Sequence, residues 1–567
     1  MFKIQKYLYV FLVVGLLLGA LMVSCSRFKV TTFYENGAVA TAAPIATEIG
    51  QQVFARGGNA FDVAVTVGFV LAVVHPQAGN IGGGGFALLR EGETGRVRSL
   101  DFRETAPLAV SENMFLDTNG EVVPGLSTYG ARAAGVPGTV AGLYELWKDH
   151  GSLSWEELVR IAADLADSGF VVDDYLAKNL KEYETELTGF EETAAIFSPG
   201  GRTLSAGDRL IQKDLGATLY IIASEGPDGF YSGLVAERID NAMKRHGGLI
   251  TLEDLDNYTA VWREPLRFMF DSLEIYSMAP PSSGGIAIGQ ILKLLELFDF
   301  SRFSSESPEY IHLFCEASRL AFADRSVHLG DPEFYRVPDN LLDKTYLAGR
   351  RENITIGHAA NSQLVQPGNP YRLESEQTTH FSVGDRKGNM IAVTYTLNTS
   401  YGSKLVVAGA GFLLNNEMDD FSIKPGFPNT YGLIGAEANK IEPGKRMLSS
   451  MAPTLVLKNG EPFLILGSPG GSKIITTVAE AIVNFVRFGL SPEETAAFPR
   501  FHHQWLPDRI LLEKGGFSTS IKQDLISYGH TVEDGEPFGD LQLIYIDPLG
   551  LMTAASDPRS RGTAAGY

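Results

Sequence analysis

The spacing of apolar residues predicts helices on either side of a strand-rich centre. Ser154-Trp155-Glu156-Glu157 is a capping-box sequence that opens an amphipathic pattern, and Gly169 ends that pattern, which predicts a helix between them. Ser491-Pro492-Glu493-Glu494 predicts another helix start, with Pro at the first helical position. The apolar residues from Ala60 to Val74 are dense enough to predict a buried helix. From Thr378 onward, alternating Thr-rich runs predict strands.

The first two of these strands, over 378–385 and 389–398, are predicted to form a hairpin. Its two runs are joined by Arg386-Lys387-Gly388, where Gly388 can take the left-handed conformation that such turns need. Pairing the residues that flank this turn places Thr378 opposite Thr396, on one face of the sheet. Asn398 is expected on the same face because side chains alternate along a strand. From the hairpin alone, the simpler interpretation is that Thr is a good strand former.

Composition describes an ordinary folded protein. The chain has 567 residues, of which 44% are hydrophobic and 20% charged. Together with the order of predicted elements, this indicates a layered α/β (α+β) arrangement with buried sheets. The formal net charge of −20 repels phosphate backbones, so no nucleic acid is expected as a partner, and solubility explains the charge.

The N-terminus is predicted to be an export signal over residues 1–25. Lys3 and Lys6 precede an unbroken apolar run over 7–23, and the ending Leu21-Met22-Val23-Ser24-Cys25 resembles a bacterial lipobox. We therefore expect a periplasmic or membrane-anchored lipoprotein with lipidation at Cys25. An uncleaved anchor helix remains the alternative, since the run reaches the lower edge of a membrane span.

Cysteine usage limits the chemistry of the exported body. Cys315 is the other cysteine, so the mature body can form neither an internal disulfide nor a multi-thiolate metal site. His502-His503 lacks carboxylates at ligand spacing, and we interpret it as structural, with no metal. Gly82–Gly85 lacks the spacing of a nucleotide-binding loop, so tight backbone packing is expected there and no cofactor.

Short motifs along nearly the whole chain resemble those of the γ-glutamyltransferases (γ-glutamyltranspeptidases). The resemblance is carried, in one order, by the segments 58–60, 75–80, 82–85, 101–104, 280–285, 323–326, 377–383, 415–420, 448–451, 467–472, 501–505 and 557–559. It implies the four-layer αββα sandwich of the N-terminal nucleophile hydrolases. It also implies that the precursor cuts itself after Gln377, which gives a large subunit (26–377) and a small subunit (378–567) that pair as a heterodimer.

By this resemblance, Thr378 is expected to be the nucleophile. A freed α-amino group has a pKa of about 7.7–8.0, so on Thr378 it can act as the base for the hydroxyl beside it. By the same resemblance, Thr396 is expected to hydrogen-bond the Thr378 hydroxyl. Gly470 and Gly471 are expected to form the oxyanion hole, where small residues let backbone N–H groups approach the carbonyl.

The expected substrates are glutathione and other γ-glutamyl compounds, with amino acids, dipeptides or water as acceptors. A γ-glutamyl group ends in a carboxylate and an ammonium, which require a cationic fork and several acceptors. The substrate-binding residues implied by the motifs are Arg103, Ser449 and Ser450 for the carboxylate, and Asn398, Glu417 and Asp420 for the ammonium. The stretch Pro425–Pro443 resembles the family's lid loop, with Tyr431 as its gate.

Two other functions remain open at this point. The same scaffold serves glutaryl or cephalosporin acylases, which have no ammonium to bind. An uncleaved, non-enzymatic surface lipoprotein is the other alternative, and it would run as a single band on denaturing electrophoresis.

Overall fold

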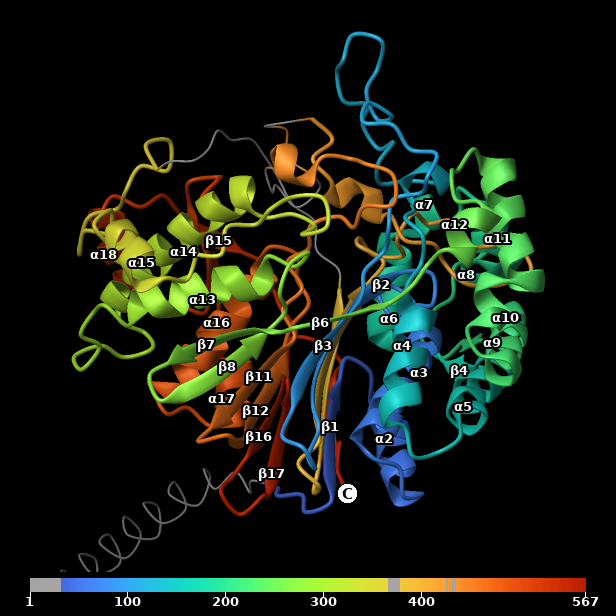
Figure 1. Cartoon of the computed structure of the whole chain (residues 1–567), viewed down its shortest axis with the longest axis horizontal. Helices are drawn as coiled ribbons and strands as arrows, with labels where there is room; N and C mark the ends of the chain where they lie inside the picture. The colour runs from blue at the N-terminus through green and yellow to red at the C-terminus, as the bar shows by residue number, and fades with distance from the viewer. Residues whose placement is uncertain (1–31, 366–377, 425–426, 428, 430–434) are drawn as a thin grey trace, which may run out of the picture. The chain divides into compact units, whose positions relative to one another are not determined.

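The computed structural model describes residues 32–365, 378–424, 427, 429 and 435–567. Within it, residues 34–567 form one compact unit. Two large sheets lie face to face between two layers of helices (Figure 1). The predicted four-layer αββα sandwich is therefore confirmed. Cys25, Gln377 and Tyr431 lie outside the described residues.

The first sheet has seven strands and is antiparallel throughout. It combines segments from before and after Thr378, so neither part of the chain could complete this sheet alone. The order of its strands is β18 (Thr563–Gly566), β1 (Gly37–Thr41), β9 (Thr379–Asp385), β10 (Met390–Thr396), β2 (Gly84–Arg90), β3 (Val97–Phe102) and β6 (Val261–Arg263).

The second sheet has six antiparallel strands and packs on the first through a small apolar cluster that includes Ala392, Leu455 and Ile544. Its order is β17 (Met552–Ser556), β16 (Gln542–Ile546), β12 (Glu461–Gly467), β11 (Thr454–Lys458), β8 (Leu273–Ser277) and β7 (Leu266–Phe270). Two small sheets lie outside the sandwich: β13 (Phe501–His502), β14 (Ile510–Glu513) and β15 (Val532–Gly535) in one, β4 (Phe170–Val171) and β5 (Arg209–Leu210) in the other.

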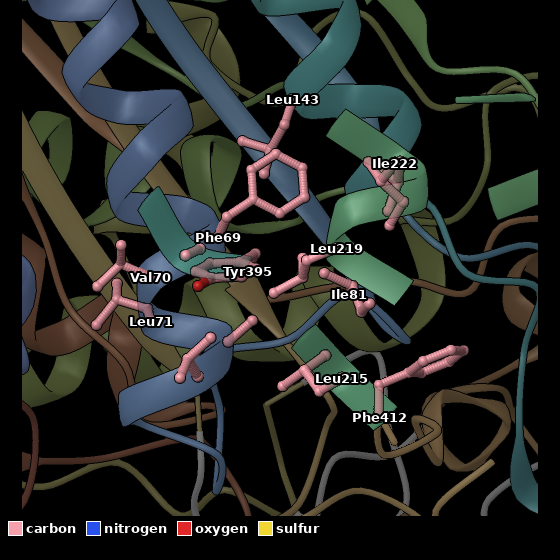
Figure 2. Packing of buried hydrophobic residues seen from close by; sticks show 14 of the residues in the cluster. Phe69, Val70, Leu71, Ile81, Leu143, Leu215, Leu219, Ile222, Tyr395 and Phe412 are labelled. Carbon is pink, nitrogen blue, oxygen red and sulfur yellow. The ribbon is translucent and has the colours of Figure 1, made fainter. Parts of the chain in front are cut away.

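The helices on the first sheet come from the N-terminal half of the chain. Helix α3 contacts β9 and β10, and all of its residues are buried. Tyr395 projects from β10 into this layer, where its hydroxyl donates to the Gly68 carbonyl at 2.9 Å (Figure 2). The helices are α2 (Pro44–Ala55), α3 (Ala60–Val74), α4 (Thr139–His150), α5 (Trp155–Ser168), α6 (Asp174–Glu182), α7 (Glu184–Leu187), α8 (Glu191–Phe197), α9 (Lys213–Glu225), α10 (Asp228–Tyr231), α11 (Gly233–His246) and α12 (Leu252–Asp256).

A second helical layer covers the other sheet. Its main cluster joins α13, α14 and α16 to the strands beneath them, and Cys315 lies fully buried within it, as expected of a small apolar residue. The helices are α13 (Gly284–Leu295), α14 (Pro308–His328), α15 (Lys344–Arg351), α16 (Lys473–Val486), α17 (Pro492–Ala497) and α18 (Thr519–Ser527). Across the described residues, no helix has the length and apolar character needed to cross a membrane.

The helix predictions hold in most details. The buried helix matches α3 at both ends, and α5 ends at Ser168 as expected. Ser491 and Glu494 form the full capping box of α17. At α5, by contrast, Ser154 accepts a hydrogen bond from the Glu157 N–H, but the described hydrogen bonds do not include the return bond from Glu157. That helix therefore begins with a simple N-cap rather than the predicted capping box.

The predicted hairpin is confirmed in its turn and its register. Asp385 donates its N–H to the Asn389 carbonyl, and Gly388 has φ 81°. Pairing continues to Tyr395 opposite Thr379, which places Thr396 and Thr378 as the next pair at the open end.

Candidate active site

Thr378 lies directly before β9, at the end of the hairpin that faces away from the turn. It is buried, with 6% of its surface exposed, and it lines a small cavity together with Thr396. The Thr396 hydroxyl accepts a hydrogen bond from the Asn398 N–H at 2.8 Å. The bond expected between the two threonine hydroxyls remains a prediction for the cleaved enzyme.

Asn398 reaches this cavity by a different route from the one predicted. Strand β10 ends at Thr396, so strand alternation cannot place Asn398 on the Thr396 face. Instead Asn398 has φ 76°, a left-handed conformation that is uncommon outside glycine and that Asn tolerates better than most residues. Its side-chain amide donates to the Asn416 carbonyl at 3.0 Å, which fixes its orientation. The placement is as predicted, but the physical reason was wrong.

The cavity gathers nearly all of the predicted substrate-binding residues. They come from the end of β3, the end of β10, the 3-10 turn Glu417–Asp420 and the segment before β11. Its lining is Arg103, Arg325, Thr378, Thr396, Asn398, Glu417, Asp420, Ser449, Ser450, Met451, Gly471 and Ile474. Of the predicted set, Gly470 lies in an adjoining cavity that also contains Thr378.

Arg103 is the central charge of this cavity. Its side chain is 1% exposed, and its guanidinium lies 2.6 Å from the Glu417 carboxylate and 2.5 Å from that of Asp420. Glu104 is a third carboxylate at 3.4 Å. Glu417 is fully buried; its Oε2 is ion-paired with Arg103, whereas its Oε1 accepts no hydrogen bond from the described residues. A buried acceptor oxygen without a donor is costly.

The cluster holds more negative than positive charge, and burial penalises the excess. Burial raises the pKa of Glu417 well above its usual range, although Arg103 opposes the rise. Burial also raises the pKa of the Glu104 carboxyl to about 7. Burial favours the neutral form of Arg103 as well, but the carboxylates around it outweigh burial and raise its pKa. Burial therefore favours the protonated forms of Glu417 and Glu104, and a nearby positive charge favours their ionised forms.

Gly470 and Gly471 form the turn between β12 and α16, as predicted for the segment that joins a strand to a helix. Both have positive φ, 130° and 53°, which a side chain would strain. Their carbonyls accept hydrogen bonds from Lys473 and Ile474, whereas neither glycine N–H donates to another described residue. These two N–H groups therefore have no described partner and belong to residues that line the cavities beside Thr378, and their role as an oxyanion hole remains a prediction.

The Gly82–Gly85 run brings β2 close to β10, as expected for tight packing. A Cβ at Gly83 would lie 2.0 Å from the Thr396 carbonyl, and one at Gly85 would lie 2.3 Å from the Thr394 carbonyl. These glycines therefore let β2 pair along β10 to its last residue, which holds Thr396 in place.

Comparison with known proteins agrees with this geometry. The family model described as gamma-glutamyltranspeptidase matches residues 46–567. The chain is 47% identical over 536 residues to the glutathione hydrolase proenzyme of Escherichia coli, which covers 94% of this chain and 92% of that protein. The chain belongs to the γ-glutamyltranspeptidase family.

Acylases are also similar to this member of the γ-glutamyltranspeptidase family. The acylase ACY 1 proenzyme of Pseudomonas sp. (strain V22) is 35% identical over 536 residues, with 93% of each chain covered. The crystal structure of cephalosporin acylase from Bacillus halodurans superposes with a TM-score of 0.85 at 27% identity, and covers 95% of this chain and 97% of that one. The scaffold is thus shared, and the residues around the nucleophile must distinguish the activities.

Arg325 lines the cavity, although the motifs assign it no role. It lies on α14, donates from Nε to the Ser283 hydroxyl at 2.8 Å and from Nη2 to the Ser450 hydroxyl at 3.2 Å. No carboxylate of the described residues forms an ion pair with it, and burial lowers its pKa to about 10. It is thus a buried cation with charge available for a substrate carboxylate.

We expect Arg325→Met to lower kcat/KM for a γ-glutamyl anilide by roughly 10- to 100-fold, because a hydrogen bond to a charged group contributes about 1.5–3 kcal/mol. Cleavage of the precursor should continue. Arg336→Met, an exposed arginine outside the cavity, is the matched control. Steady-state kinetics and a thermal melt separate lost binding from lost folding. Unchanged kinetics in a folded Arg325→Met protein would exclude Arg325 from binding the substrate carboxylate.

A second titratable cluster lies away from the active site. His312 Nδ1 is 2.7 Å from His530 Nε2, and the buried Glu316 pairs with Arg319 at 3.0 Å. His502 and His503 also have hydrogen-bonding partners, in Thr476 and Asp508, which is consistent with a structural role. These histidines and Glu316 therefore form packing networks with partners already in place.

Proposed function

We propose that the protein hydrolyses glutathione and transfers its γ-glutamyl group to amino acids or dipeptides, with Thr378 as the nucleophile of a self-cleaved precursor. The observation that carries this proposal is the buried arrangement of Arg103 between Glu417 and Asp420 in the same cavity as Thr378. The relatives named glutathione hydrolase proenzymes support it.

The arrangement matches a zwitterion. The α-carboxylate of a γ-glutamyl group would take the Arg103 fork, assisted by the hydroxyls of Ser449 and Ser450. Its ammonium would meet Glu417 and Asp420, where Glu417 Oε1 has no hydrogen-bond donor among the described residues. The ammonium thus adds a donor and a positive charge beside these carboxylates, and the γ-carbonyl is directed toward Thr378.

The chemistry follows from the freed N-terminus. Cleavage after Gln377 converts an amide nitrogen, which cannot act as a base, into the α-amine of Thr378. That amine takes the hydroxyl proton while Oγ attacks the γ-carbonyl, and the N–H groups of Gly470 and Gly471 stabilise the oxyanion. The protonated α-amine then gives this proton to the nitrogen of the leaving amine, the C–N bond breaks, and a γ-glutamyl ester remains on Thr378. Water or an acceptor amine then releases the product.

The cavity favours this function over acylase activity. A glutaryl group carries the same terminal carboxylate but no ammonium, so it would leave Glu417 and Asp420 without a cationic partner. We expect kcat/KM for a γ-glutamyl anilide to exceed that for the matching glutaryl anilide by at least about 100-fold. Release of the common aniline measures both. Faster turnover of the glutaryl compound would support the acylase instead.

We also propose that residues 1–25 export the protein and that Cys25 carries a lipid. The basic start, the apolar run and the lipobox-like ending support this proposal. Cys25→Ser should release the processed protein from the membrane fraction of the producing cells, while its activity is retained. A membrane-bound Cys25→Ser protein would indicate an uncleaved anchor helix.

A further inference from the structure

Left-handed backbone is concentrated in the loop 397–404, which follows the hairpin of β9 and β10. Six described residues other than glycine have a positive φ, and three of them lie in this loop: Asn398 at 76°, Tyr401 at 60° and Lys404 at 66°. Such backbone is costly for a residue with a side chain, and it persists only where surrounding contacts hold it. Because Asn398 lines the donor cavity, the contacts that hold this loop also bear on the site.

The Lys404 side chain turns back into its own loop. Lys404 is 6% exposed, and its ammonium donates to the Thr399 hydroxyl at 3.1 Å and to the Gly402 carbonyl at 2.7 Å. Among the described residues, no carboxylate forms an ion pair with it. Burial lowers the pKa of Lys404 to about 8, while Glu186 opposes the fall. The side chain therefore keeps most of its charge at neutral pH and directs it at two oxygens of the loop.

A continuous chain of hydrogen bonds joins Lys404 to Asn398. The Thr399 hydroxyl that accepts from Lys404 also accepts from the Asn416 side-chain amide at 2.9 Å. The Thr399 N–H donates back to Asn416 Oδ1 at 3.1 Å. The Asn416 carbonyl in turn accepts from Asn398 Nδ2 at 3.0 Å. Since Nδ2 makes that bond, Oδ1 is the atom of the Asn398 amide that can accept from a substrate ammonium.

We propose that Lys404 is a positioning residue for donor recognition, which holds the loop 397–404 so that Asn398 can receive the ammonium of the γ-glutamyl group. Lys404 does not line the donor cavity, so it acts through Thr399 and Asn416 rather than on the substrate. This inference rests on the proposed function, because it requires a donor that carries an ammonium.

The chemistry of a lysine suits this task. One ammonium supplies three donors, so it can join two oxygens of the same turn, and charged donors form hydrogen bonds roughly twice as strong as neutral ones. A cation buried without a carboxylate partner costs stability. Lys404 is therefore not explained as a stabilising ion pair, whereas its contacts to a strained loop beside the cavity give it a use.

Lys404→Met tests this assignment, because methionine keeps most of the side-chain length and removes the ammonium. We expect KM for a γ-glutamyl anilide to rise about tenfold with kcat within about twofold, since the lost contacts orient the donor and take no part in the chemistry. A glutaryl anilide has no ammonium, so its kcat/KM should stay within about twofold. Lys293→Met is the control expected to leave both substrates unchanged, since Lys293 is a partly buried lysine on α13 that pairs with Glu296.

A second background tests the route through Asn398. Asn398→Gly removes the side-chain amide and suits the left-handed backbone at that position. In that background, Lys404→Met should raise KM by less than about twofold more, because the group that Lys404 positions is gone. Two independent losses that multiply would show that Lys404 does not act through Asn398.

The outcomes separate this inference from the proposed function. A wild-type protein that does not turn over the γ-glutamyl anilide would contradict the proposed function itself. An active wild type whose Lys404→Met variant keeps its KM would overturn only the role of Lys404. So would an equal loss on the γ-glutamyl and glutaryl anilides, since that indicates general damage to the site. Should the Met variant not fold, Lys404→Asn gives the same comparison, because Asn tolerates the left-handed backbone.

Discussion

Thr378→Ala is expected to remain one uncut chain and to lose at least about 10⁴-fold of its activity. The change removes the hydroxyl that attacks both the precursor bond and the substrate carbonyl, and loss of a catalytic nucleophile has effects of this size. Folding should be little affected, because the hairpin pairing is made by backbone groups from Thr379 onward. Denaturing electrophoresis and γ-glutamyl anilide turnover measure the two effects.

Thr378→Ser is the matched control for this variant. Serine keeps a hydroxyl and, after cleavage, an α-amine, so we expect slower but detectable processing and measurable activity. A processed and active Thr378→Ala protein would contradict the nucleophile assignment. So would a Thr378→Ser protein as inert as the Ala variant, if both melt like the wild type.

Arg103→Lys is expected to lower kcat/KM for a γ-glutamyl anilide by at least about 100-fold, because truncating a partner of a buried charge pair costs about 2–5 kcal/mol. Lysine keeps the charge among Glu417, Asp420 and Glu104, which avoids leaving three buried carboxylates without a cation. It lacks the planar fork that contacts two partners at once and can hold the substrate carboxylate.

Arg98→Lys on β3 is the control for that change, since Arg98 points to Asp149 and Trp262 outside the cavity. Precursor cleavage should proceed in both variants, because it does not involve the zwitterion. Kinetics within threefold of wild type in Arg103→Lys would exclude Arg103 from donor binding. A block of cleavage in that variant would show that its role is structural.

The hairpin shows what the sequence could predict. Gly388 and the alternation around it determine a register, and the register brings Thr378 and Thr396 together without knowledge of the rest of the fold. Local signals of the same kind predicted α3 and the turn at Gly470. Each prediction depended on residues close together in the chain, where backbone geometry gives few alternatives.

Contacts between distant elements could not be predicted in this way. Arg325 lies on α14 and Asp540 lies before β16, and only the packing of the sandwich brings both of them near Thr378. The motif over 323–326 includes Arg325 without assigning it a role, and no motif includes Asp540. Asn398 is a smaller case, since its backbone is left-handed and its side chain contacts the Asn416 carbonyl from another part of the chain.

The pairing of Arg103 with Glu417 and Asp420 sharpens the motif-based assignment. The motifs implied a cation for the substrate carboxylate and acceptors for its ammonium, as separate roles. The structure places them in direct contact, so the donor must insert its two charges into an ion-paired cluster that already exists. In the proposed function, recognition of the γ-glutamyl group would therefore be an exchange of partners within one buried network.

Intact-mass spectrometry of the purified wild-type protein tests most directly whether Thr378 becomes an N-terminal nucleophile. We expect two chains, of which the smaller begins at Thr378 and carries a free α-amine, and we expect the protein to hydrolyse a γ-glutamyl anilide. A single chain near the full mass of 61.5 kDa with that activity, or a cut at another bond, would contradict it.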